Sequence, residues 1–407
     1  MHRTMQTMRE KNPDHLPSSS STFPSDQHPH TPTQTLDTSI WCRLPPSLFD
    51  RILHFLPAPA FFRLQLLSCR IRALLFSPSF LHSHILLSPL RPSFAFFPNS
   101  NPSSLYLLDP TSLSWHHLPL APLLPSHIPV APAASSAGLL CFVSLTAGPK
   151  TLLLINPLSK LIANLPQNPT PRLSPAIGLS VGPSSLSVVI AGDNLISPFS
   201  VKNLSSEMFF ADTTPTLSPW SLSSPLPRLC SIEPNRMVFS SGKFYCMSVS
   251  PYAVLVYDQA SNSWSHIQPP MRRYLRSPSL VEFGEGVGLV AAVEKNRLNV
   301  PRSVRVWSLQ PCGHSWVEIS RMPVDVHARF YENCGGGEST GAFECVGHGG
   351  LIAFVAGTNS EVLLFDMPRR EWRWAPSCRY PCEGGLKVFA YEPRIATPAI
   401  GLLTMAS

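Results

Sequence analysis

Charged residues are scarce in this sequence: they account for 14% of its 407 residues, whereas hydrophobic residues account for 44%. This composition excludes wholesale disorder and supplies enough apolar material for a sizeable core. No apolar run approaches the roughly 18 residues that a membrane-spanning helix needs. Residues 1–11 are polar and charged rather than signal-like. We therefore expect a soluble, intracellular protein.

The sequence also lacks the motifs of common metal sites and enzymes. It contains neither C-x-x-C nor His-x-x-x-His, and the nearest cysteine spacing, Cys378 with Cys382, offers too few ligands for a structural zinc site. G-x-S-x-G, P-loop and zincin motifs are missing too. We expect no metal, no cofactor and no catalytic residue. The ten scattered cysteines favour reduced thiols over a disulfide framework.

Proline, in contrast, is abundant: it occupies 45 of the 407 positions, roughly twice the average usage of about 5%. Because its ring blocks helix interiors, strands and turns should dominate. The length predicts two units, a small module and a large domain. Residues 1–40 are rich in Ser, Thr, Pro, His and Gln and should form a disordered tail. Residues 401–407 are expected to be a short C-terminal tail.

Residues 41–84 carry apolar side chains at helical spacing. The pattern predicts three short helices: one that follows Pro46, one that opens at Pro59, and one that stops before Pro78. So small a module buries little of its own apolar surface.

Three apolar residues fall off the expected inner faces of these helices: Phe55, Phe61 and Leu66. We therefore expect part of the module's apolar surface to contact a partner. The alternative is that this surface docks against its own neighbour in the chain.

A repeat of about 50 residues runs through the rest of the chain. In one copy, the strand Val254–Asp258 ends in a carboxylate and Trp264 follows six residues later; the other copies show the same order with substitutions. The spacing of the copies, 47 to 58 residues, is close to the kelch period. The residues at which the strands end are Asp109, Asn156, Asn203, Asp258, Ser308 and Asp366.

Units of this kind cannot bury their own faces, so they should stack radially as blades of a propeller. Six copies predict six blades over residues 85–400, with Leu386–Tyr391 closing the ring against the first blade; a degenerate seventh blade is the alternative. The recurring tryptophans Trp115, Trp264 and Trp372 are interpreted as interblade packing, and the recurring aspartates as turn-forming residues. The expected fold class is α+β multidomain: a three-helix module followed by an all-β, kelch-type propeller.

The formal charge of +7 is unevenly distributed. Between residues 272 and 305, seven basic residues face only three acidic ones. This basic stretch could meet DNA phosphates with salt-dependent, sequence-independent affinity. The alternatives are a solvated basic rim or a surface for an acidic partner. Its basic residues are Arg272, Arg273, Arg276, Lys295, Arg297, Arg302 and Arg305.

Residues 43–82 resemble an F-box, on the strength of the Leu44-Pro45 opening, the run 50–53 (DRIL) and the run 55–57 (FLP). They depart from it at 67–71, where the family's usual Val-Cys-Lys is replaced. The resemblance implies that the helices bind a Skp-like adaptor, although some of the residues involved could instead be module core. The residues to which it assigns adaptor binding are Leu44, Pro45, Leu48, Ile52, Leu53, Leu56, Pro57 and Phe62.

An F-box followed by kelch-like repeats resembles the plant F-box/kelch substrate receptors. Longer stretches are similar to the floral-regulator members of that family: 172–181, 191–207, 270–280, 290–310 and 316–323. This resemblance implies a non-catalytic substrate-recognition subunit of a cullin-type (SCF) ubiquitin ligase, located in the nucleus and also in the cytoplasm. It further implies a cofactor of a LEAFY-type transcription factor in flower and meristem development. The alternative is a ligase-independent co-regulator that bridges the factor to DNA.

Overall fold

The computed structural model describes residues 43–89, 91–194, 203–212, 220–227, 230–232, 236–284, 286–294, 301–333, 343–356, 361–380 and 385–397. The tails expected at 1–40 and 401–407 lie outside these ranges. No helix within them is long and apolar enough to cross a membrane.

Four short helices occupy the segment between residues 43 and 89, one more than expected. They are α2 (Pro46–His54), α3 (Ala58–Gln65), α4 (Cys69–Leu75) and α5 (Pro78–Leu87). Pro78 ends the third helix as predicted, but it also opens a fourth, because proline fits the first turn of a helix. The Ser77 hydroxyl caps this helix by accepting the Phe80 N–H at 3.3 Å. The helical segment therefore extends past residue 84 to Leu87.

The helical segment has a small core of aromatic rings. Phe61 is fully buried and lies 6.3 Å from Phe80 between ring centroids, and Phe80 stacks on His54 at 4.4 Å. The expectation that Phe61 faces outward is therefore wrong. Because α3 begins at Ala58 and Phe61 occupies its inner face, Phe61 contributes to packing rather than to the surface.

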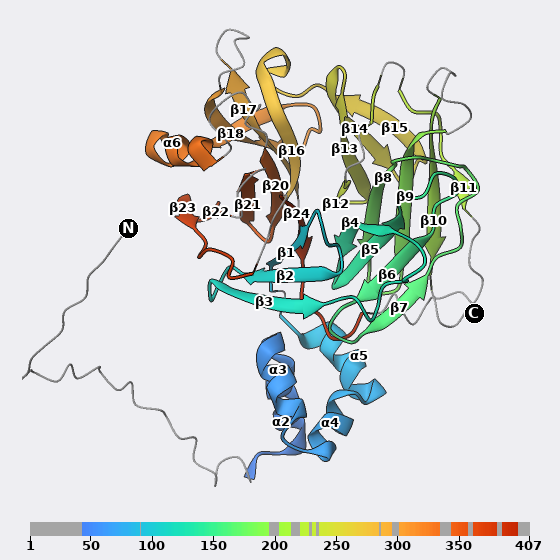
Figure 1. Cartoon of the computed structure of the whole chain (residues 1–407), viewed down its shortest axis with the longest axis vertical. Coiled ribbons are helices and arrows are strands. Elements are labelled where there is room, and N and C mark those ends of the chain that lie inside the picture. The colour runs from blue at the N-terminus through green and yellow to red at the C-terminus, as the bar shows by residue number, and fades with distance from the viewer. Residues whose placement is uncertain are drawn as a thin grey trace, which may run out of the picture. The chain divides into compact units, whose positions relative to one another are not determined.

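The rest of the described chain forms six antiparallel sheets of four strands each (Figure 1). Blade 1 consists of β24 (Leu386–Tyr391), β1 (Ser93–Pro98), β2 (Ser104–Asp109) and β3 (Ser114–Pro119). Blade 2 consists of β4 (Val130–Ser136), β5 (Leu139–Ser144), β6 (Leu152–Asn156) and β7 (Leu161–Asn164). Blade 3 consists of β8 (Ala176–Val181), β9 (Leu186–Asp193), β10 (Leu204–Ala211) and β11 (Ser221–Leu222).

Blades 4 to 6 repeat the same order of strands from the centre outward. Blade 4 consists of β12 (Val238–Ser240), β13 (Lys243–Val249), β14 (Tyr252–Asp258) and β15 (Ser263–Ile267). Blade 5 consists of β16 (Leu275–Phe283), β17 (Gly286–Glu294), β18 (Pro301–Leu309) and β19 (Trp316–Arg321). Blade 6 consists of β20 (Phe343–His348), β21 (Leu351–Ala356), β22 (Val362–Asp366) and β23 (Glu371–Trp374).

The last strand closes the ring as predicted. β24 pairs antiparallel with β1, with Phe94 opposite Ala390 and Phe96 opposite Val388. The first blade is thus built from both ends of the propeller sequence, so the ring has no free inner strand at its seam. The six-bladed fold class expected from the repeat is confirmed.

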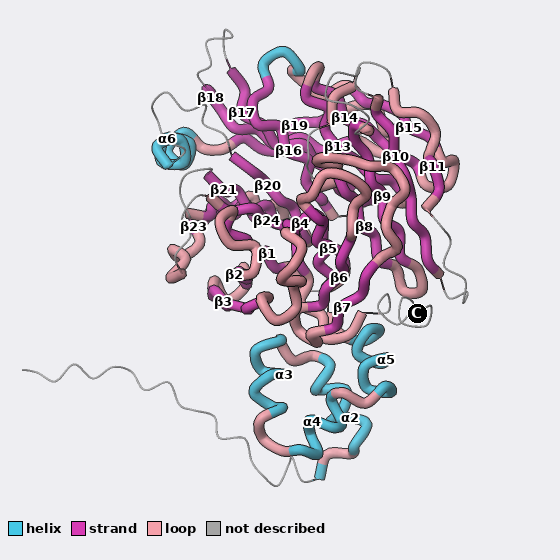
Figure 2. Tube along the Cα trace, turned by 45° about the vertical axis from the view of Figure 1, so that its right-hand side comes forward, coloured by secondary structure: helices cyan, strands magenta, loops and turns pink. Residues whose placement is uncertain are grey.

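Apolar cores lie between neighbouring blades rather than within single sheets. Six clusters of buried side chains each join one adjacent pair of blades. The cluster between blades 5 and 6 also takes in Phe330 from α6 (Val324–Asn333), the helix that leads from blade 5 to blade 6 (Figure 2). Because every blade depends on its two neighbours for burial, the ring folds as one cooperative unit.

The tryptophans of the outer strands join adjacent blades in two ways. Their rings pack against the interblade clusters, as predicted for Trp115 and Trp264. In addition, the indole N–H of Trp115 donates to the Pro376 backbone oxygen of blade 6 at 2.7 Å, and that of Trp264 donates to the Ser206 hydroxyl of blade 3 at 2.8 Å. The repeat therefore supplies a hydrogen bond as well as a packing residue.

The repeated carboxylates hold the turns that follow the third strand of blades 1, 4 and 6, as predicted. Asp109 accepts the Thr111 N–H at 2.9 Å, and Asp258 accepts the Ala260 N–H at 3.0 Å. Asn203 was the wrong anchor for blade 3, because it precedes β10 instead of ending it. The third strand ends at Ala211, and Trp220 takes the outer-strand tryptophan position, with its indole N–H donating to Pro166 at 2.7 Å.

Candidate partner-binding sites

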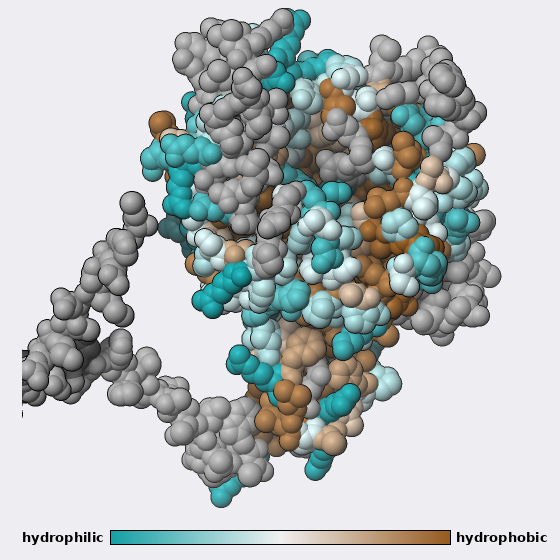
Figure 3. Space-filling view, in the orientation of Figure 1, coloured by the Kyte–Doolittle hydropathy of each residue, from teal (hydrophilic) through white to brown (hydrophobic). Residues whose placement is uncertain are grey.

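Exposed apolar side chains gather on the helical segment. Among the described residues, 8 of the 18 large hydrophobic side chains that are exposed belong to residues 43–89. Figure 3 shows several of them as brown surface on this segment. A stretch this short that leaves so many apolar side chains exposed has a surface suited to a partner. They are Leu48, Ile52, Phe55, Leu66, Leu67, Phe76, Leu86 and Leu87.

The residues predicted to bind an adaptor divide into surface and core. Leu48 and Ile52 are exposed (47% and 37%), and Pro45 is exposed as well. Leu53 is only 2% exposed, so it supports the module from inside and is not available for contact. The half-buried members are Leu44, Leu56, Pro57 and Phe62.

The F-box resemblance did not include three of the most exposed side chains of this segment among its adaptor-binding residues. Phe55 is 49% exposed, Leu66 is 86% exposed and Leu67 is 68% exposed. Helical spacing already placed Phe55 and Leu66 off the inner faces, so a signal for them was present in the sequence. Leu67 follows α3 directly, in the connection to α4.

Two buried histidines line the core beneath this surface. The Nδ1 atoms of His54 and His84 lie 3.5 Å apart, and His84 also stacks on Phe80. Burial, with a smaller contribution from the neighbouring His54, lowers the pKa of His84 to about 4. Burial likewise lowers the pKa of His54. The two rings are therefore neutral at neutral pH and act as core residues.

The basic stretch presents two free arginines at the edge of a hollow between blades 4 and 5. Arg272 and Arg273 form a single 3-10 turn, Arg272–Tyr274, and make no ion pair in the described part of the chain. They border a hollow of about 940 Å³, which Tyr252 and Tyr274 also line. Arginine beside tyrosine suits an acidic or phosphate-bearing partner.

Two other members of the basic stretch are paired with carboxylates. Arg276 forms an ion pair with Glu294, and Arg305 pairs at 3.0 Å with Glu318, which also pairs with Arg321, so both side chains are engaged within blade 5. Arg302 lies at the start of β18. Lys295 and Arg297 lie outside the described residues. Among the side chains that the structure describes, Arg272 and Arg273 are the members of the stretch left for the predicted phosphate contact.

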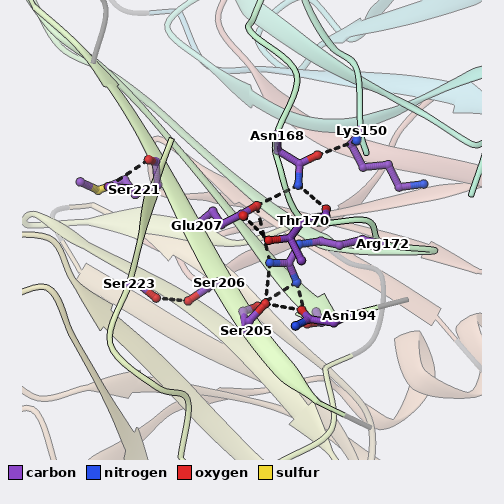
Figure 4. Close-up of polar contacts among 12 residues, drawn as sticks. Lys150, Asn168, Thr170, Arg172, Asn194, Ser205, Ser206, Glu207, Ser221 and Ser223 are labelled. Atoms are coloured by element: carbon purple, nitrogen blue, oxygen red, sulfur yellow. Dashed lines mark hydrogen bonds and ion pairs between the residues drawn. The ribbon is translucent and has the colours of Figure 1, made fainter. Parts of the chain in front are cut away.

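A buried polar network ties blade 2 to blade 3 (Figure 4). Arg172 is fully buried; its guanidinium donates to the Gly192 and Ser205 backbone oxygens (2.7 and 2.9 Å) and lies 3.7 Å from the Glu207 carboxylate. Asn168 donates to the same carboxylate at 2.8 Å. Burial lowers the pKa of Arg172, and Glu207 counteracts that shift. The network clamps β9 and β10 together, and the two terminal guanidinium nitrogens of Arg172 and both Glu207 carboxylate oxygens have hydrogen-bond partners within it.

The turn carboxylates Asp258 and Asp366 each pair with a basic side chain. Burial would raise the pKa of Asp366, but hydrogen bonds from Arg369 outweigh it and hold the pKa of this carboxyl below its usual value. The Asp258 pKa is lowered in the same way, with Lys243 3.2 Å away. Each carboxylate is ionised and engaged in its own turn.

Four short helices with exposed apolar faces, followed by a six-bladed propeller, define an F-box protein of the kelch type. The family described as the KIB1-4 beta-propeller matches residues 124–334. Protein ABERRANT PANICLE ORGANIZATION 1 of Oryza sativa subsp. japonica is 50% identical over 96% of this chain and 96% of its own length. Protein UNUSUAL FLORAL ORGANS of Arabidopsis thaliana is 45% identical over 91% of this chain and 89% of its own length.

F-box only protein 6 of Arabidopsis thaliana is more distant: it is 28% identical over 85% of this chain and 72% of its own length. The chain belongs to the plant F-box proteins that carry this propeller. Membership in that family supports a substrate-receptor role, in which the chain binds partners and does no chemistry.

Proposed function

We propose that this protein is the substrate-recognition subunit of a cullin-type SCF ubiquitin ligase. The observation that carries the proposal is the gathering of exposed apolar side chains on α2–α5, since the propeller buries most of its own. These helices bind a Skp-like adaptor that connects to the cullin scaffold, and the propeller holds the target. Activity then arises from proximity, because a held target meets the loaded conjugating enzyme at high effective concentration.

The proposed target or partner of the propeller is a LEAFY-type transcription factor in flower and meristem development. The similarity to proteins named for floral organs and panicle organisation supports this assignment. For this role we propose a location in the nucleus, with the cytoplasm as a second location.

A second function is favoured by a separate observation, the two unpaired arginines of the 272–274 turn. In this function the protein is a transcriptional co-regulator that acts without the ligase and bridges the factor to DNA. Arg272 and Arg273 would meet the phosphate backbone, while the transcription factor reads the bases.

Affinity purification from floral meristem tissue tests the ligase function. Co-purification of a Skp-like adaptor and a cullin is the expected result. Recovery of the transcription factor without either subunit, and with retention that depends on DNA, would favour the co-regulator instead.

Gel shifts across a salt series test the phosphate contact, with the factor present in every lane. The double variant Arg272→Glu/Arg273→Glu should weaken the ternary complex and flatten its salt dependence. Arg379→Glu, which changes an exposed arginine elsewhere in the propeller, is the matched control and should behave as wild type. Unchanged affinity and slope in the double variant would exclude DNA contact at this turn.

A further inference from the structure

The innermost strands of the six blades enclose a channel that is blocked part of the way along. Arg236, directly before β12, reaches across it from blade 4: its guanidinium donates to the Val388 backbone oxygen at 3.0 Å and contacts the Glu344 carboxylate and the Cys345 backbone oxygen. These acceptors belong to blades 1 and 6. Arg236 lines two separate hollows, one of about 330 Å³ and one of about 110 Å³, so it forms a floor between them.

The larger hollow, called here the inner chamber, has walls from all six blades. One wall depends on Gly347: a Cβ at this position would lie 2.1 Å from the Glu282 backbone oxygen. Only glycine therefore lets β20 approach β16 this closely. The chamber is a consequence of ring closure, because no single blade contains it.

The two acidic side chains of the inner chamber differ in their partners. Glu392 and Arg394 neutralise one another across 2.8 Å, and Arg236 is matched by Glu344. Glu282 has His348 as its ion-pair partner in the described chain, at 3.7 Å, and no arginine or lysine there pairs with its carboxylate. Its side chain is 40% exposed, so the carboxylate is accessible from the chamber.

The remaining lining suits the hydrocarbon part of a ligand. Leu179, Val181 and Leu280 provide aliphatic wall, and Phe239 adds an aromatic ring that can face a cation. A volume of about 330 Å³ lies near the lower end of small-molecule sites, which span roughly 300–1,000 Å³. The chamber therefore combines one free carboxylate with apolar walls in a space for a small molecule.

We propose that the inner chamber binds a small organic cation, a molecule with one guanidinium or ammonium group on a short aliphatic stem. The Glu282 carboxylate accepts the charged N–H donors, which form stronger hydrogen bonds than neutral ones. Arg236 closes the far end and fixes the depth of the site. The proposal is independent of the adaptor surface and of the basic turn.

Calorimetric titration of the full chain with n-butylguanidine and with n-butylurea tests this proposal. The two compounds have closely similar shapes, but only the first carries a charge at neutral pH. Butylguanidine should bind about tenfold or more tightly than butylurea, as expected for a charge-assisted hydrogen bond. Equal binding of both compounds, or heat from neither, would overturn the proposal without any variant.

Two variants locate the site. Glu282→Gln should abolish the preference for the cation, whereas Glu371→Gln, which changes an exposed carboxylate on β23 outside the chamber, should keep it. The melting temperature of each variant shows whether the propeller is intact. A preference that survives in folded Glu282→Gln would place the cation elsewhere and overturn the assignment to this chamber.

Discussion

The helical segment and the propeller treat apolar side chains in opposite ways. In the propeller, strands such as β1 and β5 are buried along their whole length, because each blade is covered by its neighbours. In the helical segment, Phe61 and Phe80 are buried while Phe55 and Leu66 remain in water. A closed ring of blades buries its own apolar side chains, whereas a small helical module leaves apolar surface that a second protein can cover.

The largest expected effect on the propeller comes from breaking its buried ion pair. Glu207→Ala removes the carboxylate beside the fully buried Arg172 guanidinium, and losing one partner of a buried pair costs about 3–5 kcal/mol. Urea unfolding of the full chain measures it. Glu371→Ala, at an exposed carboxylate, should change stability by less than about 0.5 kcal/mol. Equal midpoints for the two variants would show that blades 2 and 3 do not depend on this network.

A smaller loss is expected at an interblade tryptophan. Trp264→Ala should destabilise the propeller by about 3 kcal/mol, at the low end for a tryptophan truncation, because the ring is only half buried. Trp264→Phe keeps part of the packing but loses the hydrogen bonds to Ser206 and Ser223, so about 1 kcal/mol should be lost. Thermal unfolding compares them; an alanine variant that melts like the wild type would contradict interblade packing.

Acid should weaken the helical segment through His84. Its pKa in the folded chain is about 4, below the ordinary value of 6.5. Between these two values His84 is increasingly protonated in the unfolded chain while it stays neutral in the folded chain. The free energy of unfolding therefore falls as pH drops from about 6.5 toward 4. Denaturation followed by helical circular dichroism at pH 7, 6 and 5 measures this. His84→Phe should flatten the dependence; an equally steep dependence in that variant would assign it to other groups.

The blades that carry the recurring Asp–Trp pattern could be predicted from the sequence, whereas the blade without it was placed wrongly. Asp109, Asp258 and Asp366 recur with a tryptophan, so six blades and the closing strand could be inferred. The anchor of blade 3 was misplaced at Asn203 because that blade has no clear Asp–Trp signature at the expected spacing; Trp220 follows the end of β10 by nine residues.

Contacts between residues far apart in the chain could not be predicted from the sequence. Nothing in the local pattern around Arg236 indicates that it spans the channel to Glu344, 108 residues later. Likewise, helical spacing placed both Phe55 and Phe61 off the inner faces and was wrong for Phe61, because the packing of four helices, one of them unforeseen, decides which faces turn inward. The charge count identified the basic stretch, but it could not show that Arg276 and Arg305 form ion pairs within blade 5.

The central claim, that the helical segment is built to be covered by an adaptor, is tested most directly by the affinity of the full chain for a purified Skp-like adaptor. The double variant Phe55→Asp/Leu66→Asp should weaken binding by about tenfold or more, with an unchanged melting temperature because both side chains are exposed. Leu161→Asp, at a 47% exposed leucine on β7, should bind like the wild type. Unaltered adaptor affinity in the folded double variant would contradict the account.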